Sequence, residues 1–507
     1  MGVAISAPLV YFSILVIAVC GIIYELIIAA VSSYLWGDSV LYFSMTIGLY
    51  MSAMGLGAFL SKFVKHKLFD AFILSETLVG FIGGSSALML FWVYANSEWY
   101  EIGLIVITCL IGVLVGVEIP LLIRILEHQS SLRQNVAHVL SYDYIGGLIG
   151  ALAFPLLFLP SLGLIRTAIA LGISNLLVAA INFIRHYRVI KFLAWQSILA
   201  FATLSFLVLI FIQAPDLETA LEQHLYRDKV IFSRQTPYQH LTLTQYHHDI
   251  RLFINGGLQF SSLDEYRYHE SLVHVPMAAV PNAKNALVLG GGDGMAVREL
   301  LKYSNLQSIE LVDLDPQMTQ LFQTESLLTQ LNQNSLNHPK VRIYHQDAYK
   351  FVEQNQSFYD VIIVDLPDPS HTALAKLYSK GFYQIVQKRL SLAGVIVTQS
   401  TSPFFAREAF WCIHRTMQAA GLNVWAYQTE VPSFGNWGFQ LASKRQLDPQ
   451  SLKLPNNLNL QFLDTPVLRS LFVLPRDLLL KNQQIQANTL MQPVILQYYQ
   501  RGWDGLR

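Results

Sequence analysis

The first 214 residues are dominated by long apolar runs separated by short polar connectors. A helix needs about 20 mostly apolar residues to cross a bilayer. Seven runs reach that length, and short connectors favour a compact antiparallel bundle. The runs cover residues 9–35, 39–61, 69–95, 102–123, 139–160, 164–184 and 192–214. The pattern therefore predicts a polytopic α-helical membrane bundle of about seven spans.

Small and acidic residues interrupt these runs. Gly146 and Gly150 are spaced so that two helices can approach closely in lipid. A carboxylate in hydrocarbon is costly, so each acidic residue is expected to face the bundle interior. Two interpretations are open: a path for an organic cation, or protonated, hydrogen-bonded groups that hold helices together. The second is preferred because the same spans offer no basic partner. The acidic residues are Glu25, Glu76, Glu118 and Asp143.

The second half of the chain has a different pattern. From about residue 230, apolar and polar positions alternate and are interrupted by Thr236-Pro237 and Gly256-Gly257, which predicts a small antiparallel sheet. Residues 261–280 have helical spacing. From Asn285 onward, near-continuous apolar strands alternate with helices, which is typical of a parallel sheet buried on both faces. We therefore predict a doubly wound, Rossmann-like α/β domain with its ligand at the carboxyl ends of the strands.

Composition supports this division. The 507 residues are 53% hydrophobic and 13% charged, well below the roughly 25% charged content of ordinary soluble domains. Residues 1–214 contain 9 Lys/Arg and 9 Asp/Glu, and the other 293 contain 25 of each. We predict a bundle at 1–214, a small β-sheet subdomain at 215–278 and the Rossmann-like domain at 279–507. Zero net charge gives no reason to expect nucleic acid, and three cysteines cannot build a disulfide framework or metal cluster.

An aspartate lies inside the glycine cluster that follows the first predicted strand, in GGGDG at 290–294. The glycines suit a tight turn beneath a nucleoside, whereas Asp293 argues against phosphate at that point. Asp313 lies about 20 residues beyond the turn, where ribose hydroxyls are held in nucleotide-binding folds. Because strand ends meet in one crevice, we expect a site for hydroxyls, amines and a positively charged sulfur. Other acids at strand ends are Asp347, Asp365 and Asp368.

On these motifs the second half resembles the polyamine aminopropyltransferases, that is, the spermidine synthases. With apolar spans in front, the whole chain resembles the membrane-anchored, multi-pass subgroup of that family, and VPSFGNWGF (431–439) resembles the family's closing segment. The other matching segments, in the family's order, are PYQHLTLT (237–244), RLFINGGLQFSSLDEYRYHESLVH (251–274), LVLGGGDGMAVRELLKY (287–303), IELVDLDP (309–316), DAYKFV (347–352) and YDVIIVDLPDP (359–369).

The resemblance implies a domain of the S-adenosylmethionine type with two adjoining sites. Asp365 would be the proton acceptor. Decarboxylated S-adenosylmethionine would be a co-substrate, and no metal or other cofactor is implied. The residues implied for the donor are Gln239, Gly290, Gly292, Asp293, Asp313, Asp347 and Ala348. Those implied for the amine acceptor are Gln259, Tyr268, His269, Asp293, Asp365 and Asp368.

Two departures from the family's pattern affect the acceptor site. Leu366 and Pro367 stand where relatives have small polar residues, which predicts a stiffer loop. Phe434 stands where many relatives carry tyrosine, which removes a hydroxyl from the amine pocket. Acceptor identity is therefore less firmly implied than donor identity.

The expected reaction moves the aminopropyl group to putrescine or a similar diamine, giving spermidine and 5'-methylthioadenosine. A class I methyltransferase is one alternative because it shares the fold and the glycine turn, but the pair Asp365 and Asp368 suits a polycationic acceptor better. A transporter or sensor whose soluble half binds polyamine is the other. The acids of the spans fit that alternative, whereas an intact Asp365 favours catalysis.

The expected location is the plasma membrane, with the catalytic domain in the cytoplasm because the donor is made there. Basic residues in the connectors argue the other way, since positive loops are usually cytoplasmic and seven spans would then place the soluble half outside. A homodimer is left open. The basic residues concerned are Lys62, Lys65, Lys67, Arg124, Arg133, Arg185, Arg188 and Lys191.

Overall fold

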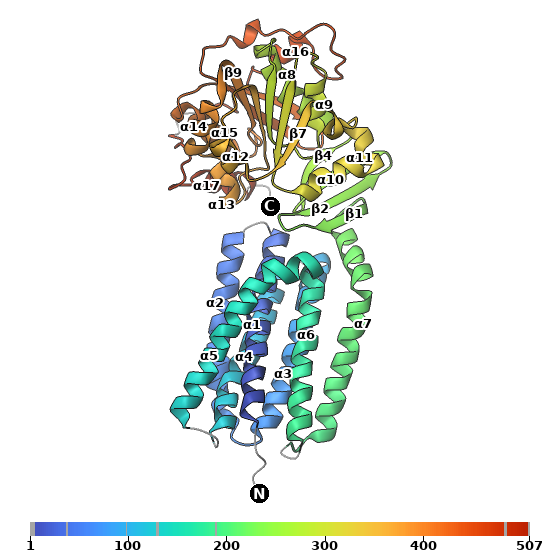
Figure 1. Cartoon of the computed structure of the whole chain (residues 1–507), viewed down its shortest axis with the longest axis vertical. Coiled ribbons are helices and arrows are strands. Elements are labelled where there is room, and N and C mark those ends of the chain that lie inside the picture. Colours follow the sequence, from blue (N-terminus) through green and yellow to red (C-terminus); the bar gives the residue numbers. More distant parts are fainter. Residues whose placement is uncertain are drawn as a thin grey trace. The chain divides into compact units, whose positions relative to one another are not determined.

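The computed structural model describes residues 6–36, 39–97, 99–127, 131–187, 190–480 and 484–504. Arg188, one of the basic connector residues, lies outside the described residues. The chain divides into two compact units, Met1–Pro237 and Tyr238–Arg507. In Figure 1 the first unit consists mainly of long helices, and the second combines sheets with helices.

Long apolar helices build the first unit. The composition change at Ala214 falls inside its last helix, which continues to Leu225 because the residues after 214 are mostly good helix formers. The elements are α1 (Ala7–Trp36), α2 (Ser39–Leu60), η1 (Ser61–Phe63), α3 (Leu68–Asn96), α4 (Tyr100–Leu126), α5 (Leu132–Ala153), η2 (Phe154–Phe158), α6 (Leu159–His186), α7 (Leu193–Leu225) and the strand β1 (Lys229–Gln235).

Six helices within the described residues are long and apolar enough to cross a membrane. This count differs from the predicted seven runs because the fifth and sixth fall in one stretch, Leu132–His186, of 55 residues. That stretch joins α5 and α6 through η2, a single π-helical segment. Gly163 near the start of α6 has a non-helical φ of 70°, and Figure 1 shows α5 and α6 as two separate rods.

Glycines allow helices of this unit to pack backbone against backbone. A Cβ on Gly146 would collide with the Leu15 carbonyl of α1, and one on Gly150 would collide with Val19 and Ile22. The predicted close approach of this glycine pair to a neighbouring helix is therefore confirmed, and α5 packs against α1.

Antiparallel strands begin the second unit, as the alternating pattern predicted. Leu243 of β2 pairs with Leu252 of β3, and β3 and β4 are joined by a tight turn in which Asn255 and Gly256 have positive φ. The elements up to the large sheet are β2 (His240–Tyr246), β3 (Asp249–Ile254), β4 (Gly257–Ser261) and α8 (Glu265–Ala279).

A seven-stranded sheet with the order β10-β11-β9-β8-β5-β6-β7 forms the centre of this unit. Strands β5 to β9 are parallel, which confirms the predicted doubly wound domain. The antiparallel pair β10 and β11 was not predicted. The strands are β5 (Asn285–Gly290), β6 (Ser308–Asp313), β7 (Val341–His345), β8 (Tyr359–Asp365), β9 (Leu390–Gln399), β10 (Asn423–Val431) and β11 (Gly435–Ser443).

Both faces of the central strands are buried. Ala286 and Val288 on one face of β5, and Leu287 and Leu289 on the other, are fully inaccessible. The remaining helices are α9 (Met295–Leu301), α10 (Pro316–Thr324), α11 (Ser326–Leu331), η3 (Ser335–Asn337), α12 (Ala348–Gln354), α13 (Thr372–Ala375), η4 (Lys376–Tyr378), α14 (Lys380–Lys388), α15 (Arg407–Ala419), η5 (Pro449–Ser451), α16 (Thr465–Ser470) and α17 (Ile495–Asp504).

A Gly150→Ala substitution should destabilise the helical unit by about 1 to 3 kcal/mol, because the added methyl group must displace α1. Gly147→Ala is the matched control, since nothing lies within 4 Å of a Cβ at that position of the same helix. Both changes raise helix propensity equally. Thermal unfolding of the purified full-length chain should show a lower midpoint for Gly150→Ala only. Equal midpoints would show that α5 does not pack on α1 through Gly150.

Candidate functional site: an acidic crevice at the strand ends

The carboxyl ends of β5 and β8 meet where the strand order of the large sheet reverses. Strand β5 lies between β6 and β8, and Gly290 pairs with Asp365. The Gly291 N–H donates to the Asp365 carbonyl (3.1 Å). Gly290 and Gly291 have φ of 83° and 65°, which glycine adopts without steric cost. A Cβ on Gly290 would collide with that carbonyl, so the turn requires glycine to approach Asp365.

Two of the predicted donor carboxylates lie against this turn. Asp293 Oδ1 accepts from the Met295 N–H at the start of α9 (2.8 Å), and burial raises its pKa while the nearby His269 opposes that shift. Asp313 Oδ1 accepts from the Asp315 N–H (2.9 Å). A Cβ on Gly292 would meet the Asp313 carboxyl group. Burial raises the pKa of Asp313 to about 6.

Gln239 is held by a residue that the sequence interpretation left out of the site. Its Nε2 donates to Asp315 Oδ2 (3.0 Å). The other carboxylate oxygen of Asp315 accepts from the Gln317 N–H (3.0 Å) and caps α10. Asp315 therefore has two functions, because it ends one element and positions Gln239.

Asp347 has a basic partner that the motifs did not indicate. Its Oδ2 lies 2.6 Å from Lys376 Nζ, and its Oδ1 accepts from the Lys350 N–H, which caps α12 (3.1 Å). Burial alone would raise the pKa of Asp347, but the hydrogen bond and charge of Lys376 outweigh it and lower the pKa. Ala348 is the first residue of α12 and is buried.

Asp365, the predicted proton acceptor, is directly bonded to Tyr268. The Tyr268 hydroxyl of α8 donates to Asp365 Oδ1 (2.6 Å). Burial raises the pKa of Asp365 to about 6, and the charge of Asp293 acts in the same direction. His269 and Tyr268 oppose that shift. A carboxyl group with a pKa near 6 and a free second oxygen atom can accept a proton near neutral pH.

The second acid of the loop, Asp368, is fixed by the end of β9. Its Oδ1 accepts from Gln399 Nε2 (3.2 Å) and its Oδ2 from the Thr401 hydroxyl (2.9 Å), while burial raises its pKa to about 6. The Tyr378 hydroxyl donates to the Pro367 carbonyl (3.0 Å), so the loop is anchored as well as stiffened by proline. Gln399, Thr401 and Tyr378 were missed, although the strand-end rule applied to β9 indicates the first two.

His269 lies in a network of charged side chains formed with Glu265 and Arg298. Its Nδ1 lies 2.7 Å from Glu265 Oε2, and Arg298 donates to both oxygens of Glu265 (2.9 and 3.0 Å). Burial alone would lower the pKa of His269, but the hydrogen bond and charge of Glu265 raise it to about 9. His269 is therefore a cation at neutral pH, and its charge favours the ionised forms of Asp293 and Asp365.

The closing segment is attached to α8 by Asp264, another residue that the sequence did not indicate. Asp264 accepts from the Ser433 N–H (2.6 Å) and hydroxyl (2.8 Å). Phe434 lies with its ring centroid 6.4 Å from that of Tyr268, so it adds an apolar wall beside the tyrosine. Gln259 of β4 is the predicted residue least connected to the acids, because its amide donates to the Gly257 carbonyl (3.1 Å).

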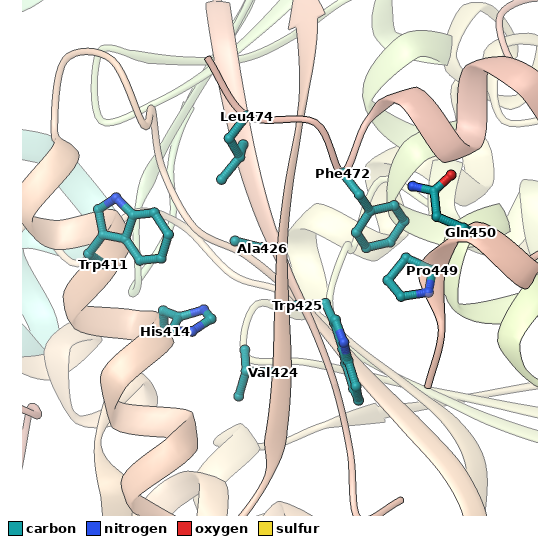
Figure 2. Close-up of a pocket in the computed structure, with 9 residues that line it drawn as sticks. All are labelled: Trp411, His414, Val424, Trp425, Ala426, Pro449, Gln450, Phe472 and Leu474. Carbon is teal, nitrogen blue, oxygen red and sulfur yellow. The ribbon is translucent and has the colours of Figure 1, made fainter. Parts of the chain in front are cut away.

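A cavity of about 420 Å³ lies elsewhere in this unit, against the outermost strand of the large sheet. Figure 2 shows its lining, with Trp411 and His414 of α15 on one side and Trp425 of β10 on another. None of its nine lining residues is acidic. It therefore offers no carboxylate to a ligand, whereas the crevice at β5 and β8 combines carboxyl groups whose raised pKa values a bound cation would lower.

The chain is similar in sequence to proteins of known activity. The family model described as spermine/spermidine synthase domain matches residues 265–453. A polyamine aminopropyltransferase of Leptospira interrogans is 40% identical over 98% of this chain and 99% of its own. That of Oceanobacillus iheyensis is 39% identical over 99% and 98%. A solved spermidine synthase in complex with the transition state analogue AdoDATO covers 49% of this chain and 86% of its own, with 26% identity and a TM-score of 0.45.

Proposed function

Because this chain belongs to the polyamine aminopropyltransferase family, we propose that it transfers the aminopropyl group of decarboxylated S-adenosylmethionine to putrescine or a similar diamine. The products are spermidine and 5'-methylthioadenosine. The observation that carries the proposal is the Asp365 carboxyl group, which is hydrogen-bonded by Tyr268 (2.6 Å) and has a pKa of about 6. It lies in a crevice whose other ionisable groups are mainly carboxylates, as a dicationic acceptor requires.

Proton transfer and substitution proceed in sequence. The alkylammonium of the diamine first loses a proton to Asp365, because a protonated amine has no lone pair for attack. The free amine nitrogen then forms a bond to the propyl carbon, and the carbon–sulfur bond breaks. The electron pair of that bond remains on sulfur, so the sulfonium becomes a neutral thioether. Asp368 holds the distal ammonium group, and positioning of the two substrates supplies much of the rate.

The donor is held by residues at the carboxyl ends of β5, β6 and β7 and by Gln239, which precedes β2. Asp313 accepts hydrogen bonds from the ribose hydroxyls, Asp347 and Ala348 contact the adenine, and Gln239 and Asp293 contact the aminopropyl part. Lys376 Nζ lies 2.6 Å from Asp347 Oδ2, so it must share or release that carboxylate when adenine binds. Ordinary S-adenosylmethionine carries an additional carboxylate, which Asp293 and Asp365 would repel. The acidic crevice therefore favours the decarboxylated donor over a methyltransferase substrate.

We propose further that the helical unit spans a lipid bilayer seven times. A continuous helix of 55 residues would be about 80 Å long, far more than the ~30 Å hydrocarbon core. The stretch that contains α5 and α6 must then cross twice. Large apolar side chains of α7 support insertion, because Ile198, Phe201 and Ile212 are 69%, 73% and 70% exposed. Lipid is the solvent in which such a surface is stable.

Substitution Asp365→Asn should lower the rate of transfer by about 10² to 10⁴, the usual contribution of a general base. Glu353→Gln is the control, since that acid is exposed on α12, and its rate should equal that of the wild-type chain. Formation of methylthioadenosine from decarboxylated S-adenosylmethionine and a panel of diamines measures both. An active Asp365→Asn variant, or no product with any amine, would contradict the proposal.

Activity should fall as pH decreases through about 6, because Asp365 must be ionised to accept a proton and its pKa is about 6. One such group gives about a tenfold decrease in kcat/KM per pH unit, and the decrease is steeper where Asp313 and Asp368 must also be ionised. His269→Gln should move this acid limb to higher pH, since the imidazolium lowers the pKa of Asp365. A profile that stays flat from pH 7 to 5 would exclude Asp365 as the base.

The catalytic unit is proposed to lie in the cytoplasm, where its donor is made. Leu392→Cys introduces a thiol at a position that is 91% exposed in the catalytic unit, and Lys65→Cys places one in the basic connector between α2 and α3. A membrane-impermeant maleimide should label Lys65→Cys but not Leu392→Cys in intact cells, and both after lysis. The opposite labelling would place the basic connectors inside, as their charge alone predicts.

A further inference from the structure

A buried polar cluster lies inside the helical unit, formed by residues of four helices. Tyr24 of α1 donates to Asn175 Oδ1 of α6 (3.0 Å), and Asn175 Nδ2 donates to Glu76 Oε2 of α3 (2.9 Å). Glu118 of α4 lies against Glu76. All four side chains are inaccessible to solvent. Two of the acids whose role the sequence left open are therefore one pair.

Three oxygen atoms of this pair have no donor. Glu76 Oε1 and both carboxylate oxygens of Glu118 are buried without a hydrogen-bond partner among the described residues. Ser75 also lies against Glu118, but its single hydroxyl proton is donated to the Leu114 carbonyl (3.0 Å). Buried polar atoms are nearly always satisfied in folded proteins. As ionised carboxylates these three acceptors would be unsatisfied, so they need either protons on the pair, shared between Glu76 and Glu118, or a donor from outside.

Among the described residues, the basic side chains of the four helices that form the cluster are directed elsewhere: in α6, Arg166 lies 3.5 Å from Glu218 and Arg185 is exposed. Helices α1 and α3 contain no Lys or Arg, and the only one in α4, Arg124, donates to the Ser61 and Val64 carbonyls (3.1 and 2.6 Å). Glu76 lies eight residues after the start of α3, about 12 Å along the helix. Two ionised carboxylates at that depth are very unfavourable. The other titratable groups that interact with the pair are Cys20 and Tyr24 of α1 and Tyr50 of α2.

We propose that Glu76 and Glu118 form a binding site for an alkylammonium group inside the bundle, separate from the catalytic crevice. An ammonium group has three N–H donors and no acceptor, so it can take the place of the displaced proton as a donor to these oxygens. The empty pair carries two protons. Binding of one ammonium displaces one proton to solution, so the site remains electrically neutral. The choice of an amine as ligand rests on the proposed function, because that reaction has amines as acceptor and product.

With this site, the helical unit binds an amine in addition to anchoring the chain. The exchange of a proton for an ammonium group is the elementary step of a proton-coupled amine carrier. It also differs from a purely structural pair of acids. A structural pair would share protons with each other and with Asn175, and it would neither bind an amine nor release a proton.

The test measures amine binding to the full-length chain in lipid nanodiscs without the aminopropyl donor. Equilibrium dialysis with radiolabelled putrescine at pH 7.5 gives the number of amines per chain, and a pH indicator in weak buffer gives the protons released. At that pH the crevice acids are already ionised, since Asp313, Asp365 and Asp368 have pKa values of about 6. Glu118→Gln is the variant, and Asp143→Asn is the matched control that removes a different acid of the bundle.

Glu118→Gln should bind one amine fewer than the wild-type chain, or bind the second at least about tenfold more weakly, and should release about one proton fewer. Asp143→Asn should match the wild-type chain in both measurements. Glu76→Gln should reproduce the effect of Glu118→Gln, which guards against a folding defect peculiar to one variant. Equal binding and equal proton release by the wild-type chain and both glutamate variants would overturn the proposal.

Aminopropyl transfer in the same nanodiscs separates this inference from the proposed function. Transfer should be unchanged in both glutamate variants, because neither residue belongs to the catalytic crevice. If transfer is absent from the wild-type chain while the difference in binding persists, the proposed function fails and the bundle site stands. If transfer is normal and the difference is absent, the bundle site fails and the proposed function stands.

Discussion

The contact between the Gly290–Gly291 turn and the backbone of Asp365 determines where every other group of the crevice lies. It joins the first and fourth parallel strands at the position where the strand order reverses. A side chain on Gly290 would push the turn away from the Asp365 carbonyl, and the aspartate of the turn would move with it. Asp293 of the donor site and the proposed base Asp365 are therefore placed by one close backbone approach.

Charge is balanced in different ways in the two units. In the catalytic unit, the buried acids lie near a protonated His269, which is in turn held by Glu265 and Arg298. The positive charge of His269 stabilises the ionised forms of Asp293 and Asp365. In the helical unit, Asn175 donates to Glu76 and Ser75 lies against Glu118, and both of these neighbours are uncharged. Electrical neutrality in the helical unit therefore requires protons on the two glutamates or a bound cation. Buried carboxyl groups thus have different consequences in the two units.

The strand-end acids could be predicted because a parallel sheet brings the residues that follow its strands to one edge. Asp293, Asp313, Asp365 and Asp368 were found in this way. Lys376 and Arg298 could not be found, because each reaches its acidic partner from a helix whose position only the folded chain defines. The antiparallel pair β10 and β11 was missed because its strands contain no near-continuous apolar run, since polar Gln440 and Ser443 stand among the buried positions of β11.

By itself the sequence determined most of the order of the elements, the division into an apolar helical half and a more charged α/β half, and the identity of the strand-end acids. These follow from periodicity and composition, which are local properties. Only the tertiary structure decided that Tyr268 bonds Asp365, that His269 is a cation rather than a neutral ligand, and that Glu76 and Glu118 form one buried pair. Hydrogen bonds and electrostatic interactions act over a few ångströms, so they depend on which distant residues the fold brings together.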